Sequence, residues 1–112
     1  MNIGVPKEIK NNEFRVGLSP SSVSELTQAG HRILIEKGAG LGSDFSDDDY
    51  TNVGATLASN AEQVFNQSEL IIKVKEPQAQ ERKLLKPSHT LFTYLHLAPD
   101  LTQTNDLLAS GA

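Results

Sequence analysis

Three polar residues of this sequence hold matching positions, each just beyond an apolar run that is typical of a buried strand. These residues are Arg15, Lys75 and His96. The apolar runs cover residues 2–5, 70–74 and 91–94. If the runs form neighbouring parallel strands, the three side chains meet at one edge of a sheet. Ligands of open α/β folds bind outside that edge, at the carboxyl ends of the strands.

The three residue types suit a small carboxylate that undergoes proton transfer. An arginine holds a carboxylate through two parallel hydrogen bonds, because its donor fork matches the two oxygens. A lysine supplies a compact charge that can also polarise a carbonyl oxygen. A histidine titrates near neutral pH and can pass a proton. Each residue alone is better explained as a solvated charge or an edge residue, but their shared placement makes a common site an equally good explanation.

Length and composition limit the class of protein. The chain has 112 residues, ten of them basic and fourteen acidic, and its formal net charge is −4. This length fits one domain with a real core, and the acidic balance argues against a nucleic-acid partner. The sequence has no cysteine, no signal-peptide pattern and no apolar run long enough for a bilayer. We therefore expect a cytoplasmic protein without a membrane partner.

Short β-rich runs alternate with helical segments along the whole chain. The expected strands cover residues 2–5, 32–36, 55–58, 70–74 and 91–95. The expected helices lie between Ser19 and Gly30, between Ser46 and Gly54, from Asn60 to Phe65, over 78–85, and from Pro99 to Gly111. Such alternation is typical of an α/β, flavodoxin-like three-layer fold, a mostly parallel sheet with helices on both faces. Because a further strand should follow the last helix, we expect a longer protein to begin with this sequence.

The glycine-rich segment 38–43 invites comparison with a dinucleotide-binding turn. It reads Gly-Ala-Gly-Leu-Gly-Ser and follows an expected strand. The full fingerprint needs a third glycine where Ser43 stands, at the start of a helix. Here the next helix begins only after Phe45, so we interpret the segment as a turn. We expect no cofactor-binding residue within this chain.

The remaining candidate groups have structural explanations. Asp47, Asp48 and Asp49 complement the positive end of a helix, so they do not require a metal ion. His31 and His89 follow a helix end and a turn, and we expect both to be structural. No serine, histidine and aspartate are spaced as a nucleophilic triad. The sequence therefore predicts no metal site.

Six stretches of the sequence resemble alanine dehydrogenases, and their spacing is intact over the whole chain. They are Ile-Gly-Val-Pro-Lys-Glu at 3–8, Asn-Asn-Glu-Phe-Arg-Val at 11–16, Gly-Ala-Gly at 38–40, the segment 70–77, Leu-Phe-Thr-Tyr-Leu-His-Leu-Ala at 91–98, and Leu-Leu at 107–108. The most specific are Val-Lys-Glu-Pro at 74–77 and Tyr-Leu-His-Leu-Ala at 94–98.

The resemblance implies reversible, NAD-dependent oxidative deamination of L-alanine to pyruvate and ammonia. It implies that Arg15 grips the substrate carboxylate, that Lys75 contacts the carboxylate or carbonyl oxygen, and that His96 is the catalytic acid and base. Members of this family are longer and usually homohexameric, with an NAD-binding Rossmann domain and a catalytic aspartate after this region. Residues 1–112 are thus expected to be an N-terminal catalytic lobe that is inactive when isolated and does not bind NAD.

Two other interpretations remain open. The soluble subunit of proton-translocating nicotinamide nucleotide transhydrogenases has a similar lobe. The residues Asn-Asn-Glu-Phe before Arg15, and His96 within the segment 94–97, favour the dehydrogenase. The length of the chain would also suit a stand-alone flavodoxin-like binding module.

Overall fold

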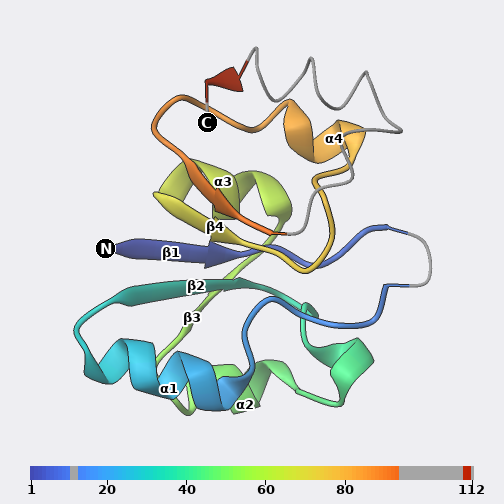
Figure 1. The fold of residues 1–112 in the computed structure, drawn as a ribbon. Helices are drawn as coiled ribbons and strands as arrows, with labels where there is room; N and C mark the ends of the chain where they lie inside the picture. Colours follow the sequence, from blue (N-terminus) through green and yellow to red (C-terminus); the bar gives the residue numbers. More distant parts are fainter. Residues whose placement is uncertain (11–12, 94–109, 112) are drawn as a thin grey trace.

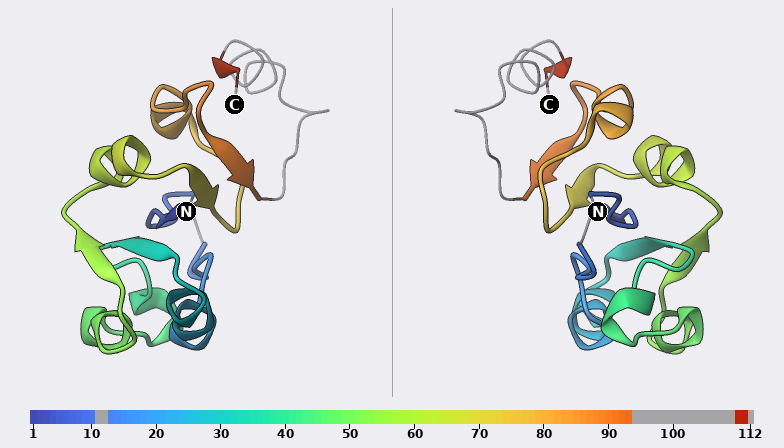
Figure 2. Two further views of the ribbon diagram at one scale, coloured as in Figure 1. Left: turned by 90° about the vertical axis from the view of Figure 1, so that its left-hand side faces the viewer. Right: turned by 90° about the vertical axis from the view of Figure 1, so that its right-hand side faces the viewer.

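A five-stranded parallel sheet lies between two layers of helices (Figures 1 and 2). The structure, a computed structural model, describes residues 1–10, 13–93 and 110–111. The strands are β1 (Asn2–Val5), β2 (Arg32–Glu36), β3 (Thr56–Ala58), β4 (Leu70–Ile72) and β5 (Thr90–Phe92). The helices are α1 (Pro20–Gln28), α2 (Asp47–Thr51), α3 (Ala61–Gln67) and α4 (Ala79–Arg82), with a 3-10 turn η1 (Leu41–Ser43). The expected α/β class, with a parallel sheet and helices on both faces, is confirmed.

The strand order is β3-β2-β1-β4-β5, and all four neighbouring pairs are parallel. This order matches the first five strands of the dinucleotide-binding arrangement and differs from the flavodoxin order 2-1-3-4-5. The chain winds outward from β1 through β2 to β3, and the crossover through α3 then returns past β2 and β1 to β4. The direction of winding therefore changes between β1 and β4, which is where such folds bind ligands.

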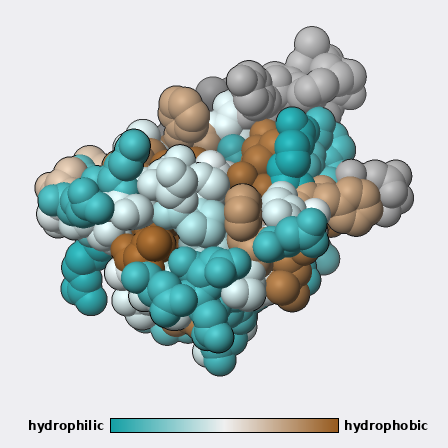
Figure 3. All heavy atoms as spheres, turned by 90° about the horizontal axis from the view of Figure 1, so that it is seen from below, coloured by the Kyte–Doolittle hydropathy of each residue, from teal (hydrophilic) through white to brown (hydrophobic). Residues whose placement is uncertain are grey.

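The sheet has a separate apolar core on each face, because its central strands are buried on both sides. On one face the strands contact α1 and α2, and the core contains Ile3, Val5, Val23, Ile33, Ile35 and Tyr50. On the other face they contact α3 and the segment after α4, and the core contains Leu34, Ala58, Val64, Phe65, Ile71 and Leu85. Apolar residues on the outer surface of the α1–α2 layer form separate patches among hydrophilic ones (Figure 3).

Side-chain caps begin three helices where the sequence predicts them. The Oγ of Ser19 accepts a hydrogen bond from the backbone N–H of Ser22, 3.2 Å away. Ser46 and Asp49 form a reciprocal capping box at α2, and Asn60 caps α3. Within the described residues, no helix is long and apolar enough to cross a membrane.

Several expected boundaries were wrong. β4 ends at Ile72 instead of residue 74, α4 stops at Arg82 instead of residue 85, and β5 begins at Thr90 and ends at Phe92. The backbone N–H of Lys73 still donates to the carbonyl oxygen of Phe92, but those of Val74 and Lys75 donate to the Glu8 carboxylate, so β4 ends early. These last two donors therefore do not continue the ladder with a neighbouring strand. Nearly all of the helix expected from Pro99 lies outside the described residues.

Candidate functional site

The candidate site lies beyond the carboxyl ends of β1 and β4, the two central strands between which the winding reverses (Figure 1). The segment after β1 carries Glu8, Glu13 and Arg15, and the segment after β4 carries Lys73 and Lys75. Contacts between these two segments cross the point where α/β folds of this kind bind ligands. Residues of both segments therefore form the site that strand positions predict at the carboxyl ends of the strands.

Arg15 and Lys75 meet at the carboxylate of Glu13. The Arg15 side chain donates to both carboxylate oxygens, Nε to Oε2 and Nη2 to Oε1, each at 3.0 Å. The Nζ of Lys75 lies 4.0 Å from Oε1 of the same carboxylate. The structure thus brings together two residues that are 60 positions apart in the sequence. Both contact a carboxylate, which is the kind of group that we expected them to bind.

Glu13 has a carboxylate whose negative charge is strongly favoured. Its side chain is only 4% exposed, whereas that of Arg15 is 67% exposed. The side-chain hydrogen bonds from Arg15, which outweigh burial, lower the pKa of Glu13 to about 2. Glu13 is therefore negatively charged throughout the neutral pH range. Sequence reasoning did not select it as a site residue, although it stands two positions before Arg15.

Two close backbone approaches hold the segment that carries Arg15. A Cβ added to Gly17 would lie 2.6 Å from the carbonyl oxygen of Ile72, at the end of β4. A Cβ added to Gly42 would lie 2.5 Å from the carbonyl oxygen of Phe14. Only glycine fits such spacing without a shift of the backbone. The glycine-rich segment therefore supports the Arg15 segment from one side while β4 supports it from the other.

The same glycine-rich segment does not fit the pyrophosphate of a dinucleotide. The backbone N–H of Gly38 donates to the carboxylate of Asp47 at 2.8 Å. A phosphate at this N–H group would face that negative charge. Gly40 also packs against the Tyr50 ring, which a Cβ would approach to 2.6 Å. These contacts agree with the interpretation of the segment as a turn.

Two hollows open on either side of Arg15. One has a volume of about 290 Å³ and includes Glu13, Phe14 and the glycine-rich segment in its wall. The other, of about 350 Å³, includes Lys73, Val74 and Phe92. Lys75 lines neither of these two hollows. A third hollow of about 410 Å³ lies at the opposite edge of the sheet, where the first residues of β1, β2 and β3 gather.

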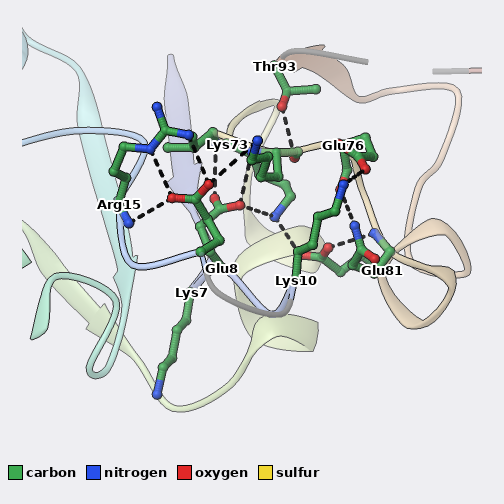
Figure 4. Close-up of polar contacts among 12 residues, drawn as sticks. Lys7, Glu8, Lys10, Arg15, Lys73, Glu76, Glu81 and Thr93 are labelled. Carbon is green, nitrogen blue, oxygen red and sulfur yellow. Dashed lines mark hydrogen bonds and ion pairs between the residues drawn. The ribbon is translucent and has the colours of Figure 1, made fainter. Parts of the chain in front are cut away.

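A second ionic cluster, which the sequence did not predict, lies under the site (Figure 4). Lys73 Nζ lies 3.1 Å from Glu8 Oε1 and 2.9 Å from Glu81 Oε2, and all three side chains are at most 2% exposed. Lys73 could have been noticed, because a lysine in an apolar run is rarely buried without a carboxylate partner. Burial raises the pKa of Glu81, while the charge of Lys73 opposes that rise.

Glu8 connects this cluster to the site. Its carboxylate accepts hydrogen bonds from the backbone N–H groups of Val74 at 3.0 Å and of Lys75 at 3.1 Å. The segment after β1 thereby fixes the backbone from which the Lys75 side chain projects. Nearby, Lys10 and Glu76 form a further ion pair, whereas Lys7 points away from the cluster (Figure 4).

His96, the third residue of the expected site, lies outside the described residues. The described chain approaches it as far as Thr93, directly after β5. The hydroxyl of Thr93 donates to the backbone carbonyl oxygen of Lys75 at 2.9 Å. The end of β5 is thus tied to Lys75, three positions before the histidine.

His89 and the three consecutive aspartates, also considered from sequence, make structural contacts. His89 is buried, its Nδ1 accepts from the backbone N–H of Lys86 at 2.9 Å, and its Nε2 lies 2.6 Å from the carbonyl oxygen of Phe65. The three aspartates form the first turn of α2. Among residues 1–10, 13–93 and 110–111, no cluster of three histidine or carboxylate side chains could hold a metal ion.

The chain is similar in sequence to known alanine dehydrogenases. The family described as "Alanine dehydrogenase/PNT, N-terminal domain" matches residues 4–112. An alanine dehydrogenase of Methanococcus maripaludis is 54% identical over 108 residues, which cover 96% of this chain and 29% of that protein. One of Mycolicibacterium smegmatis is 50% identical over 111 residues, which cover 99% of this chain and 30% of that protein. The chain thus spans about 30% of the length of these relatives.

Solved structures show the same fold. An L-alanine dehydrogenase superposes with a TM-score of 0.94 at 50% identity, over 98% of this chain and 30% of that one. A transhydrogenase from Sinorhizobium meliloti superposes with a TM-score of 0.91 at 28% identity, over 99% of this chain and 33% of that one. The fold is therefore shared by both kinds of enzyme, while the sequence is nearer to the first.

Proposed function

The chain belongs to the alanine dehydrogenase/PNT N-terminal domain family, and on that premise we propose that it is the substrate-binding lobe of an NAD-dependent L-alanine dehydrogenase. The proposed reaction is the reversible oxidative deamination of L-alanine to pyruvate and ammonia. The observation that carries the proposal is that Arg15 and Lys75 both contact the Glu13 carboxylate. This contact lies beyond the carboxyl ends of β1 and β4, where the direction of winding changes. Identities of 50–54% to alanine dehydrogenases support the choice of substrate.

Each site residue has a distinct role in this proposal. The guanidinium of Arg15 binds the substrate carboxylate, and Lys75 contacts the carboxylate or the carbonyl oxygen. His96 accepts and returns protons as water adds to the imine and ammonia leaves. Since the glycine-rich segment does not fit a dinucleotide, NAD is bound by a part of the protein outside this chain.

Alanine-dependent reduction of NAD by the whole protein tests the proposal. We expect NADH formation with alanine and NAD, and NADH consumption with pyruvate and ammonia, both followed at 340 nm. The 112-residue chain alone is expected to be inactive, because it lacks a dinucleotide site among its described residues. Absence of both reactions in the folded whole protein would reject the proposal. Hydride transfer between nicotinamide nucleotides without turnover of alanine would favour the transhydrogenase, which shares the fold.

Replacement of Arg15 by Lys should mainly weaken substrate binding. The lysine keeps the charge but loses the paired donors, and a hydrogen bond to a charged group contributes about 1.5–3 kcal/mol. In the whole enzyme the KM for pyruvate should therefore rise roughly 10- to 100-fold, with kcat changed only a few-fold. Steady-state kinetics at saturating ammonia and NADH measure both values. Arg32→Lys, at the exposed start of β2, is the matched control and should change neither. A lower kcat with an unchanged KM would remove Arg15 from the binding role.

A further inference from the structure

We propose that Glu13 sets the charge of the substrate site, so that the site accepts a monocarboxylate and discriminates against a dicarboxylate of the same shape. The inference rests on the proposed function, because it assumes that Arg15 and Lys75 bind the substrate carboxylate. It goes further by assigning a role in substrate selection to Glu13, a residue that would not itself need to touch the substrate.

The two proposed binding cations are already in contact with an anion of the protein. Glu13 accepts two side-chain hydrogen bonds from Arg15 at 3.0 Å and lies 4.0 Å from the Nζ of Lys75. Two positive charges and one negative charge leave the trio with a net charge of +1. One substrate carboxylate would neutralise that charge.

The neighbouring ion pairs add no positive charge to this balance. Lys73 is paired with Glu8, and Lys10 is paired with Glu76. Lys7 points away from these two pairs (Figure 4), but it is exposed and lines the same hollow as Glu13 and Arg15. Glu81 also contacts Lys73, so any charge that it contributes is negative. In the hollow that Glu13 and Arg15 line, a second negative charge on the ligand would therefore meet only the exposed Lys7 as a further cation.

The position of Glu13 makes its charge effective. Its side chain is 4% exposed, so the carboxylate itself has little contact with water, although it lies near the surface beneath Arg15. Repulsion between Glu13 and a second ligand charge bound to the same cations would oppose binding of a dianion. Because Arg15 is well exposed and the site is open to water, we expect a discrimination of about tenfold rather than several orders of magnitude.

A purely structural role of Glu13 predicts a different outcome. If the carboxylate only orients the Arg15 side chain, its removal weakens every carboxylate ligand by a similar factor. If it sets the charge, its removal shifts the ratio between monoanion and dianion affinities. That ratio therefore separates the two roles, whereas the affinity for a single ligand does not.

Oxamate and oxalate form a suitable pair of probes, because both resemble pyruvate in shape and differ from each other by one negative charge. Their inhibition constants against pyruvate reduction by the whole enzyme should show tighter binding of oxamate in the unsubstituted protein. Glu13→Gln should shift the ratio of the two constants about tenfold toward oxalate. Glu13→Asp keeps the charge and should keep the ratio. Glu62→Gln, which removes an exposed carboxylate from α3, should also keep it.

An unchanged ratio in Glu13→Gln, or an equal loss of affinity for both probes, would overturn the proposal. If this variant does not fold by circular dichroism, Glu13→Ala provides the same comparison. Should the whole protein fail to reduce pyruvate, the proposed dehydrogenase function is rejected separately. Calorimetric titration with the two probes then still decides the role of Glu13: the same tenfold shift supports it, and an unchanged ratio or no binding of either probe rejects it.

Discussion

Replacement of Lys73 by Met is expected to lower the free energy of unfolding of the chain by about 3–5 kcal/mol. Lys73 is 1% exposed and contacts two carboxylates, those of Glu8 and Glu81, which are each 2% exposed. Methionine fills a similar volume but leaves both carboxylates without their common cation. Because domains are typically stable by only about 5–15 kcal/mol, the loss is a large share of the total. Urea denaturation followed by circular dichroism measures it.

The pH dependence of the same variant provides a second test. Burial already raises the pKa of Glu81, and without Lys73 that pKa should rise further. A carboxyl group whose pKa is higher in the folded state binds more protons there than in the unfolded chain, so its contribution to stability falls as pH rises. The difference in the free energy of unfolding between the unsubstituted protein and Lys73→Met should therefore become smaller as the pH is lowered from 7 to 5. Lys37→Met, at an exposed position, is the control and should change stability by less than about 0.5 kcal/mol.

The strands and helix caps could be predicted from sequence because their determinants are local. β1 and β2 have the expected bounds, since each is an apolar run followed by residues that interrupt it. Ser19, Ser46 and Asn60 begin their helices through hydrogen bonds within four residues. The end of β4 could not be predicted, because it depends on Glu8, more than 60 positions away. The strand order likewise depends on which way each crossover turns, which periodicity does not encode.

The sequence predicted site residues from their positions after the strands of the sheet. Arg15 and Lys75 were selected because each follows a central strand, and the parallel sheet brings such positions together. Glu13 was missed although Arg15 is only two positions away, because its second partner, Lys75, comes from the separate segment after β4. Lys73 was missed because a single lysine barely alters the apolar pattern of residues 70–74. The buried charge nevertheless indicates a partner, so charged residues within apolar runs merit the same attention as those at the ends of strands.

Replacement of His96 by Ala is expected to lower kcat of the whole enzyme by roughly 10²–10⁴-fold, the usual contribution of a positioned acid or base. The KM for pyruvate should change little, because Arg15 and Lys75 retain the substrate carboxylate. The expectation rests on the family resemblance and on the path of the chain, since Thr93 ties the end of β5 to Lys75 three positions before the histidine. Steady-state kinetics in both reaction directions measure the two constants.

The pH profile of kcat and rescue by imidazole can distinguish a role of His96 in proton transfer from a structural role. If His96 is the acid and base, the limb of the kcat profile near neutral pH should disappear in His96→Ala, and added imidazole should restore part of the turnover. His31→Gln is the matched control, because His31 directly precedes β2 at the opposite edge of the sheet, and it should retain both turnover and profile. An unchanged kcat in His96→Ala would remove His96 from the acid–base role. A loss of kcat without a change in the pH profile would instead assign it to positioning.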